Sequence, residues 1–282
     1  MTRVGFAAVS MNEPAPILTF LSDYGLADDF VGVCHGVIAA ICPAAHVIDL
    51  DHGIRRHDVR AGAIVLAEAL PYLPVGVHLA VVDPDVGAER RAVALACADG
   101  RVLVGPDNGL LVPAAEQAGG IVAAADIARS PFRLEPVSAT FHGRDIFAPV
   151  AAALANGVTV PEVGEPLDPA ELVVLELPEA HMQDGTLIAH VRYVDGFGNV
   201  QLNAGHADLA GSGLKLGHAT LIALDADREL PAQYARTFAD VPRGELLLYE
   251  DAARRLSVAV SHGDAAQRLG VGVDDELRIS PQ

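Results

Sequence analysis

The sequence contains no tryptophan, only 5% aromatic residues and three cysteines among 282 residues. With so few aromatic side chains, the core must be built from Ala, Val, Leu and Ile, which suits a parallel sheet covered by alanine-rich helices. Cys34, Cys42 and Cys97 are odd in number and form no C-x-x-C pair. We therefore expect buried, reduced thiols in a cytoplasmic protein rather than a disulfide framework.

Positive charge is also scarce. The chain has 19 basic against 37 acidic residues, a net charge of -18, and Lys215 is its single lysine. An acidic surface repels phosphate backbones and anionic lipids, which argues against nucleic-acid and membrane partners. The same charge suits a cationic small ligand.

Long apolar runs are lacking too. No run approaches the roughly 20 residues that span a bilayer. The N-terminal stretch is too weakly apolar for a signal peptide, so residues 1–15 are expected to be a disordered leader. The hydrophobic content of 51% nevertheless excludes a disordered chain, because it provides ample apolar surface for a core.

Strand and helix patterns alternate over residues 16–168. This alternation, with continuous apolar strands, predicts an N-terminal α/β domain with a largely parallel central sheet. The expected strands are 17–21, 47–50 and 77–82, with a hairpin at 92–96 and 102–104 and helices at 31–41, 59–70 and 145–155.

The pattern changes after residue 168. Residues 169–184 are rich in proline and acidic residues and are interpreted as a linker. Residues 185–282 contain short apolar runs separated by glycines, with weak helix signals. They predict a smaller all-β, barrel-like domain.

Acidic residues follow several predicted strands. Asp23, Asp83 and Asp107 come directly after such strands, and the carboxyl ends of parallel strands are where ligands bind in α/β sheets. A carboxylate at Asp23 can hold a ribose diol. Asp28 and Asp29 are placed to cap the next helix.

Three further segments have a simpler structural interpretation beside a functional one. Gly87 lies in a turn that can fold Arg90 back toward Asp83, although by spacing alone a surface ion pair of little energetic value is the preferred interpretation. Gly143, next to His142, allows a ligand to approach the backbone. Residues 195–199 read as a tight hairpin turn.

A metal hydrolase is a further alternative, because carboxylates and imidazoles ligate divalent ions. The sequence has no H-E-x-x-H or H-x-H pair, so a structural role is preferred and no metal is expected. The residues considered for such a site are Asp23, Asp49, Asp51, His52, His57 and His142.

Five segments taken together resemble the S-adenosyl-L-methionine (SAM) hydroxide adenosyltransferase family, which is related to bacterial fluorinase and chlorinase. They occur in the family's order and spacing over nearly the whole chain. The segments are 22–25 with Asp28, 82–90, 105–110, 140–145 and 195–199.

The resemblance implies hydrolysis of SAM by water attacking the ribose C5′, giving adenosine and L-methionine without a cofactor or metal. It also implies a homotrimer with sites between one subunit's large domain and its neighbour's small domain. The family's water-activating residues fall on Asp83, Arg90 and His142, and which of them is the base stays open.

The resemblance also assigns substrate contacts. Asp23 matches the acid that holds the ribose hydroxyls, and Asp28 and Gly143 belong to matching segments. In the small domain, Asp195 and Asn199 match ligand contacts. Asp195 would lie near the amino-acid end of the substrate and Phe197 beside the adenosine. The segment 251–254 replaces the family's Asn-Ser-x-Gly, and Arg254 could reach the substrate carboxylate instead.

Two other functions remain as alternatives. The first is a halide adenosyltransferase, but the resemblance implies an aromatic residue at position 83 in halide enzymes and a serine at position 143 in fluoride enzymes. Asp83 would repel a halide, so hydrolysis is favoured. The second is a non-catalytic sensor of adenosine or SAM, which the altered segment 251–254 would suit.

Overall fold

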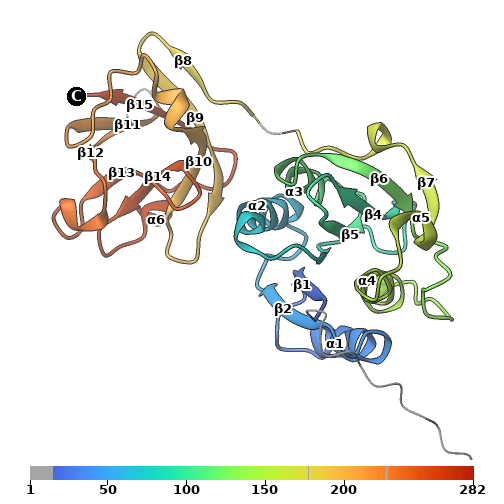
Figure 1. Cartoon of the computed structure of the whole chain (residues 1–282). Helices are drawn as coiled ribbons and strands as arrows, with labels where there is room; N and C mark the ends of the chain where they lie inside the picture. The colour runs from blue at the N-terminus through green and yellow to red at the C-terminus, as the bar shows by residue number, and fades with distance from the viewer. Residues whose placement is uncertain (1–14, 177, 226–227) are drawn as a thin grey trace, which may run out of the picture. The chain divides into compact units, whose positions relative to one another are not determined.

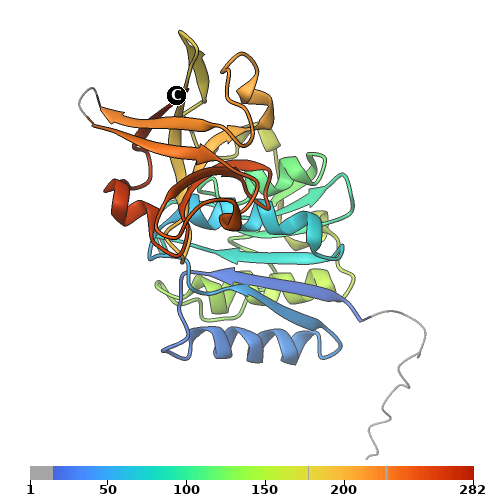
Figure 2. The same cartoon turned by 90° about the vertical axis from the view of Figure 1, so that its left-hand side faces the viewer.

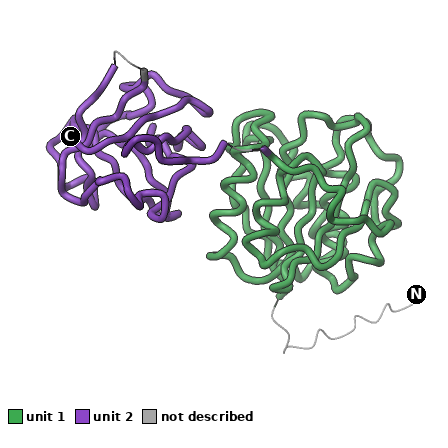
Figure 3. The backbone as a smooth tube through the Cα atoms, turned by 90° about the horizontal axis from the view of Figure 1, so that it is seen from above, with its two compact units in different colours: residues 1–175 green, residues 176–282 purple. Residues whose placement is uncertain are grey.

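The structure is a computed structural model that describes residues 15–176, 178–225 and 228–282. All but the last residue of the expected leader lies outside this range. The chain forms two compact units, residues 1–175 and 176–282 (Figure 3). The boundary between them falls inside the segment 169–184 that the sequence assigned to a linker.

The first unit contains a seven-stranded sheet in the order β2-β1-β3-β5-β4-β6-β7. The pairings from β2 to β5 are parallel and those from β5 to β7 are antiparallel. The α/β class is confirmed, and so is the β4–β5 hairpin. The strands are β1 Ile17–Ser22, β2 His46–Asp51, β3 Val77–Val81, β4 Ala92–Cys97, β5 Val102–Pro106, β6 Ile121–Asp126 and β7 Glu165–Leu167.

Helices cover both faces of this sheet (Figures 1 and 2). The helices α1 and α4 pack together on one face and α2 and α3 on the other. In α1, Val31, Cys34 and Ile38 recur at helical spacing and are buried. The helices are α1 Phe30–Ile41, α2 Val59–Ala69, η1 Leu70–Tyr72, α3 Val112–Gln117, η2 Gly143–Phe147, α4 Ala148–Ala155, α5 Val160–Val163 and η3 Pro169–Glu171.

The core of the first unit is aliphatic, as the composition requires. Leu18, Leu79 and Val104 from the strands are fully buried, and Phe20 and Phe147 are its largest fully buried aromatic side chains. All three cysteines are buried free thiols. No helix in the described part of the chain is long and apolar enough to cross a membrane.

In the second unit, the strands β9 to β15 close into a barrel because β9 pairs with both β15 and β10. The predicted barrel-like domain is confirmed. Residues 181–183, within the predicted linker, form β8 and pair with β9. The elements are β8 His181–Gln183, β9 Thr186–Val194, β10 Val200–Gly205, η4 His206–Leu209, β11 Ala219–Asp225, β12 Arg228–Tyr234, η5 Phe238–Asp240, β13 Leu246–Glu250, β14 Arg255–Val260, α6 Ala265–Leu269 and β15 Glu276–Pro281.

Candidate active site

The carboxyl ends of β1 and β3 bring two aspartates to one edge of the sheet. The two strands are parallel neighbours, with Ser22 opposite Val81. Asp23 directly follows β1, and Asp83 comes two residues after the end of β3. The Asp23 carboxylate accepts a hydrogen bond of 2.9 Å from the backbone N–H of His57. The strand register therefore places both carboxylates where ligands bind in such sheets.

Asp83 is held by Arg90 in a two-point ion pair. Arg90 Nε donates to Asp83 Oδ1 over 2.8 Å, and Arg90 Nη2 donates to Oδ2. Both side chains are nearly buried, with 8% of Arg90 and 6% of Asp83 exposed. The guanidinium also lies over the Phe147 ring, 5.2 Å from its centroid. The pair is thus a fixed and desolvated group rather than the mobile surface ion pair that the spacing also allowed.

Arg90 also connects to His142. Its Nη2 lies 2.9 Å from His142 Nδ1. A guanidinium can only donate, so Nδ1 accepts and the proton of the neutral imidazole resides on Nε2. Burial, followed by the charge of Arg90, lowers the pKa of His142. The ring is therefore held neutral, with a fixed tautomer.

The turn that carries Arg90 contacts the segment before His142. A Cβ at Gly87 would lie 2.3 Å from the backbone oxygen of Ala139, and Gly87 has a φ of +83°. Only glycine permits this conformation at this distance. Asp85, in the same turn, lies outside the left-handed region.

His142 precedes a turn of π-helix, Gly143–Phe147, which runs into α4. The sequence placed the helix start at residue 145. The helix therefore begins earlier than predicted, with His142 as its N-cap residue. Single π turns inside helices are frequent at functional sites. Here Asp145 fastens the turn, because its carboxylate accepts hydrogen bonds from Arg144 Nε (2.6 Å) and from the backbone of Ser138 (2.7 Å).

Tyr24 is a site residue that sequence reasoning did not single out. Its ring contacts Phe30 and Phe141, with centroids 5.7 and 5.9 Å away. Burial, and then the neighbouring groups Cys34, Asp23 and Asp83, raises its pKa well above the usual value. The phenol therefore stays protonated beside both carboxylates. The sequence signal that could have identified Tyr24 is its position between Asp23 and Gly25, directly after a predicted strand.

Asp107 and Asn108 support the site rather than line it. Asn108 Nδ2 donates to the backbone oxygen of Val82 over 2.8 Å, which fixes the residue before Asp83. Asp107 accepts from Arg91 Nε over 2.8 Å and from the backbone of Val173 over 2.9 Å. These bonds tie the end of β5 to β3 and to the end of the first unit.

Asp28 lies in the exposed segment between β1 and α1. Asp29 occupies the N-cap position of α1, but its side chain makes no capping hydrogen bond. The predicted cap by side-chain hydrogen bonding is therefore wrong for Asp29. Both residues still place negative charge near the positive end of the helix.

In the second unit, residues 195–199 form the β9–β10 turn. Asp195 Oδ1 accepts from the backbone of Phe197 and of Asn199, and Asp195 Oδ2 accepts from Asn199 Nδ2. The carboxylate thus organises the turn, and it leaves the Phe197 side chain projecting, with 81% of this residue exposed. The hairpin interpretation holds, and the exposed ring is available to a ligand.

Asp251 is a second structural centre that the sequence did not indicate. Its carboxylate accepts four hydrogen bonds, from the Gln201 and Ser257 side chains and from the backbone of Ala253 and Arg255. Arg254, at the tip of the same turn, has a φ of +63° and pairs with Glu250 over 2.9 Å. Its side chain is 86% exposed.

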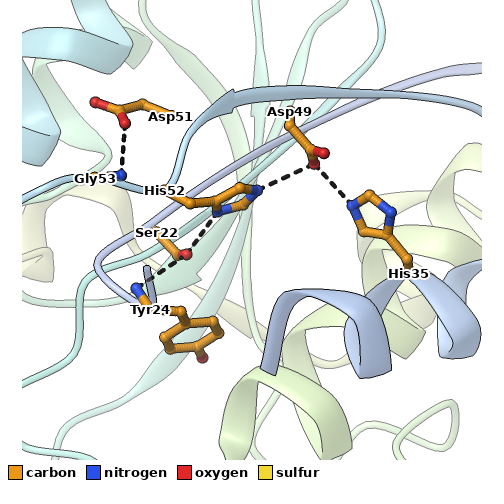
Figure 4. A network of polar contacts seen from close by, with 7 residues as sticks. All are labelled: Ser22, Tyr24, His35, Asp49, Asp51, His52 and Gly53. Carbon is orange, nitrogen blue, oxygen red and sulfur yellow. Dashed lines mark hydrogen bonds and ion pairs between the residues drawn. The ribbon is translucent and has the colours of Figure 1, made fainter. Parts of the chain in front are cut away.

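Residues considered for a metal are only partly brought together. Asp51 accepts from the backbone of Gly53. Asp49 and His52 meet, and they are joined by His35, which the sequence analysis did not consider (Figure 4). Within the described residues, this is the one group of three or more potential metal ligands.

Comparison with known proteins places the chain in a family. Residues 18–164 match the SAM hydroxide adenosyltransferase N-terminal domain, and residues 189–278 match the C-terminal domain. The chain belongs to the SAM hydroxide adenosyltransferase family. The two matches fall in the first and the second unit respectively, and Asp83, Arg90 and His142 all lie within the N-terminal match.

Members of the SAM hydroxide adenosyltransferase family and related enzymes differ in their sequence identity to this chain. A protein from Salinispora tropica named (R)-S-adenosyl-L-methionine hydrolase is 49% identical over 95% of this chain and 98% of its own. A fluorinase from Nocardia brasiliensis is 27% identical over 95% of this chain and 98% of its own. A solved structure of an uncharacterized conserved protein from Thermotoga maritima has a TM-score of 0.87 at 36% identity, over 93% of this chain and 99% of its own.

Proposed function

We propose that this protein hydrolyses SAM to adenosine and L-methionine. The observation that carries the proposal is the hydrogen-bonded set of Asp83, Arg90 and His142 at the end of β3. The 49% identity to a protein named as a SAM hydrolase supports it.

In the proposed reaction, the water oxygen bonds to the ribose C5′ as the C5′–S bond breaks. The bonding pair returns to sulfur, which converts the sulfonium to the neutral thioether of methionine. Because the sulfonium leaves without protonation, the enzyme needs no general acid. Its main task is to align water opposite sulfur, and such alignment contributes up to about 7–11 kcal/mol.

Asp83 is the group we assign to take the water's proton. The two-point clamp of Arg90 fixes the carboxylate, and its remaining lone pairs can accept. His142 cannot accept through Nδ1, because Arg90 occupies that atom. Its Nε2–H can instead donate to the water oxygen and orient the attacking lone pair. The proton passes from Asp83 to solvent after the step.

Substrate binding would use both units. Asp23 would accept hydrogen bonds from the ribose hydroxyls, and Asp28 adds negative charge that favours the cationic substrate. In the small domain, we assign Phe197 to the adenosine, Asp195 to the amino-acid end, Asn199 to a further substrate contact, and Arg254 to the carboxylate. The resemblance supports a homotrimer in which neighbouring subunits complete each site. The protein would act in the cytoplasm, with no metal or cofactor taking part in the reaction.

Halide transfer is disfavoured because position 143 has no room for the serine expected in fluoride enzymes. A Cβ there would lie 2.1 Å from the Tyr24 hydroxyl, so a serine at this position requires Tyr24 to move. Asp83 also places a negative charge where an anionic nucleophile would have to enter.

The test is product analysis of SAM incubated with the purified protein, with and without chloride and with and without a chelator. We expect adenosine and methionine in all four reactions. Formation of 5′-chloroadenosine would instead support halide transfer, and tight SAM binding without products would support a sensor. Loss of turnover with the chelator, while circular dichroism shows that the protein stays folded, would contradict the metal-free mechanism.

A further inference from the structure

His35, Asp49 and His52 converge outside the proposed catalytic set. His35 lies on α1, Asp49 lies in β2, and His52 directly follows β2 (Figure 4). A single carboxylate oxygen, Asp49 Oδ1, lies 2.7 Å from His35 Nε2 and 3.1 Å from His52 Nε2. The three potential ligand atoms all lie within 4.8 Å of one another.

We propose that these three residues bind a divalent transition-metal ion, with Zn²⁺ as the ion that the donor set suits best. Two imidazole nitrogens and one carboxylate oxygen are ligands of Zn²⁺, whereas Mg²⁺ and Ca²⁺ prefer oxygen alone. In the structure, the imidazole N–H groups point at the shared oxygen. To ligate the ion through Nε2, each neutral imidazole would adopt the tautomer that carries its proton on Nδ1.

The distances need only a small adjustment. Metal–ligand bonds of about 2.0–2.2 Å in a tetrahedron put neighbouring ligand atoms roughly 3.3 Å apart. The two separations of 2.7 and 3.1 Å would have to widen by roughly 0.6 and 0.2 Å. The two imidazole nitrogens, which lie within 4.8 Å of each other, would have to come to about the same separation. Asp49 and His35 have partly exposed side chains, at 45% and 35%, so they can make this shift.

His52 is the rigid member of the site. Only 3% of its side chain is exposed, its ring meets the Phe20 ring edge at a centroid distance of 4.7 Å, and its Nδ1 lies 2.8 Å from Ser22 Oγ. When Nε2 ligates a metal, Nδ1 carries the proton and donates to this oxygen. Partners of this kind orient metal-ligating histidines and raise affinity.

The exposure of Asp49 and His35 leaves one side of the ion open to water. The site also connects to the end of β1, because Ser22 Oγ accepts a hydrogen bond from the Tyr24 backbone over 3.3 Å. An ion there would cross-link α1 to β2 and stiffen the strand end that supplies Asp23. It would act on stability and not on the attacking water.

The test is calorimetric titration of the tag-free full-length protein with Zn²⁺, together with the visible absorption of bound Co²⁺. We expect saturable binding of a single ion per chain and a higher Tm with the ion. His35→Gln and Asp49→Asn keep polar side chains but should each weaken binding at least about tenfold. Circular dichroism verifies that each variant is folded.

Two matched substitutions serve as controls. His46→Gln changes an exposed histidine at the start of β2, and Asp51→Asn changes a carboxylate that bonds to the Gly53 backbone instead. Both should bind Zn²⁺ like the wild type. The proposal is overturned if the wild type shows no saturable site, or if all four variants bind equally well.

Discussion

Gly143 and Tyr24 are in such close contact that a Cβ at position 143 would lie 2.1 Å from the Tyr24 hydroxyl oxygen and 3.0 Å from its Cζ. The contact joins the residue after His142 to the exit of β1, which carries Asp23. Because Gly143 has no side chain, the segment that carries His142 can lie this close to the β1 exit that carries Asp23.

Gly143→Ala should lower the free energy of unfolding by about 1–3 kcal/mol, because overpacking forces Tyr24 to shift, and turnover should fall with it. Tyr24→Phe in the same chain removes the shortest contact and should restore part of the stability. Urea denaturation measures both effects. Gly32→Ala in α1 meets nothing within 4 Å and should be neutral or slightly stabilising; equal losses at both glycines would contradict the contact.

Asp83→Asn should lower kcat by about 10²- to 10⁴-fold while the Kd for SAM changes little, since the carboxylate acts on the transition state. Arg90→Lys should also lower kcat, because an ammonium cannot reproduce the two-point clamp. Single-turnover kinetics and equilibrium binding separate the two quantities. Asp85→Asn, an exposed change in the same turn, is the control, and a similar loss there would refute the assignment.

The lowered pKa of His142 should appear in its titration. Burial and the charge of Arg90 favour the neutral ring, so protonation should occur only below the ordinary value of about 6.5. Arg90→Gln removes that charge and should move the pKa upward. NMR titration of the imidazole measures both values, and an unchanged pKa in the variant would show that Arg90 does not act on His142.

His78 should make the protein sensitive to acid. It is fully buried, its Nδ1 bonds to Thr19 Oγ1, and burial lowers its pKa to about 4. Below the unfolded-state pKa of about 6.5, the unfolded chain binds a proton that the native protein does not. Stability is therefore present above about pH 6.5 and falls toward pH 4, by about 2–3 kcal/mol at pH 4.5.

The contribution of His78 can be isolated with His78→Asn, which keeps a polar group near Thr19. Urea denaturation at pH 7 and pH 4.5 should show a smaller decrease in the free energy of unfolding for the variant than for the wild type. Parallel decreases in the two proteins would mean that other groups account for the acid sensitivity.

Substitutions at Asp251 and at Arg254 should have very different effects on stability, although both residues lie in the same turn. Asp251→Ala leaves four donors without their acceptor and should cost about 2–4 kcal/mol of stability. Arg254→Ala removes an exposed ion pair and should change stability by less than about 1 kcal/mol. If Arg254 binds the substrate carboxylate, its loss raises KM about tenfold with kcat unchanged. Thermal unfolding and steady-state kinetics test both statements.

The sequence alone was sufficient to predict the two architectures and many of their elements. Apolar runs and helical spacing depend on local chemistry, so β1 to β5, α1 and α2 could be predicted directly, whereas β6, β7 and α3 were not predicted. Local signals failed where the backbone deviates from a regular helix: the sequence predicted an ordinary helix from residue 145, whereas a π turn begins at Gly143. They also failed at Asp29, whose side chain is suited to capping but makes no capping bond.

For the site, the sequence determined which residue types follow which strands and, by resemblance, which of them belong together. Only the tertiary structure decided that Arg90 bonds to Asp83 and His142 at once, that Tyr24 fills the space beside Gly143, and that His35 meets Asp49 and His52. Those relationships join residues up to 119 positions apart. They arise from strand register and helix packing, which bring such residues into contact without leaving a periodic pattern in the chain.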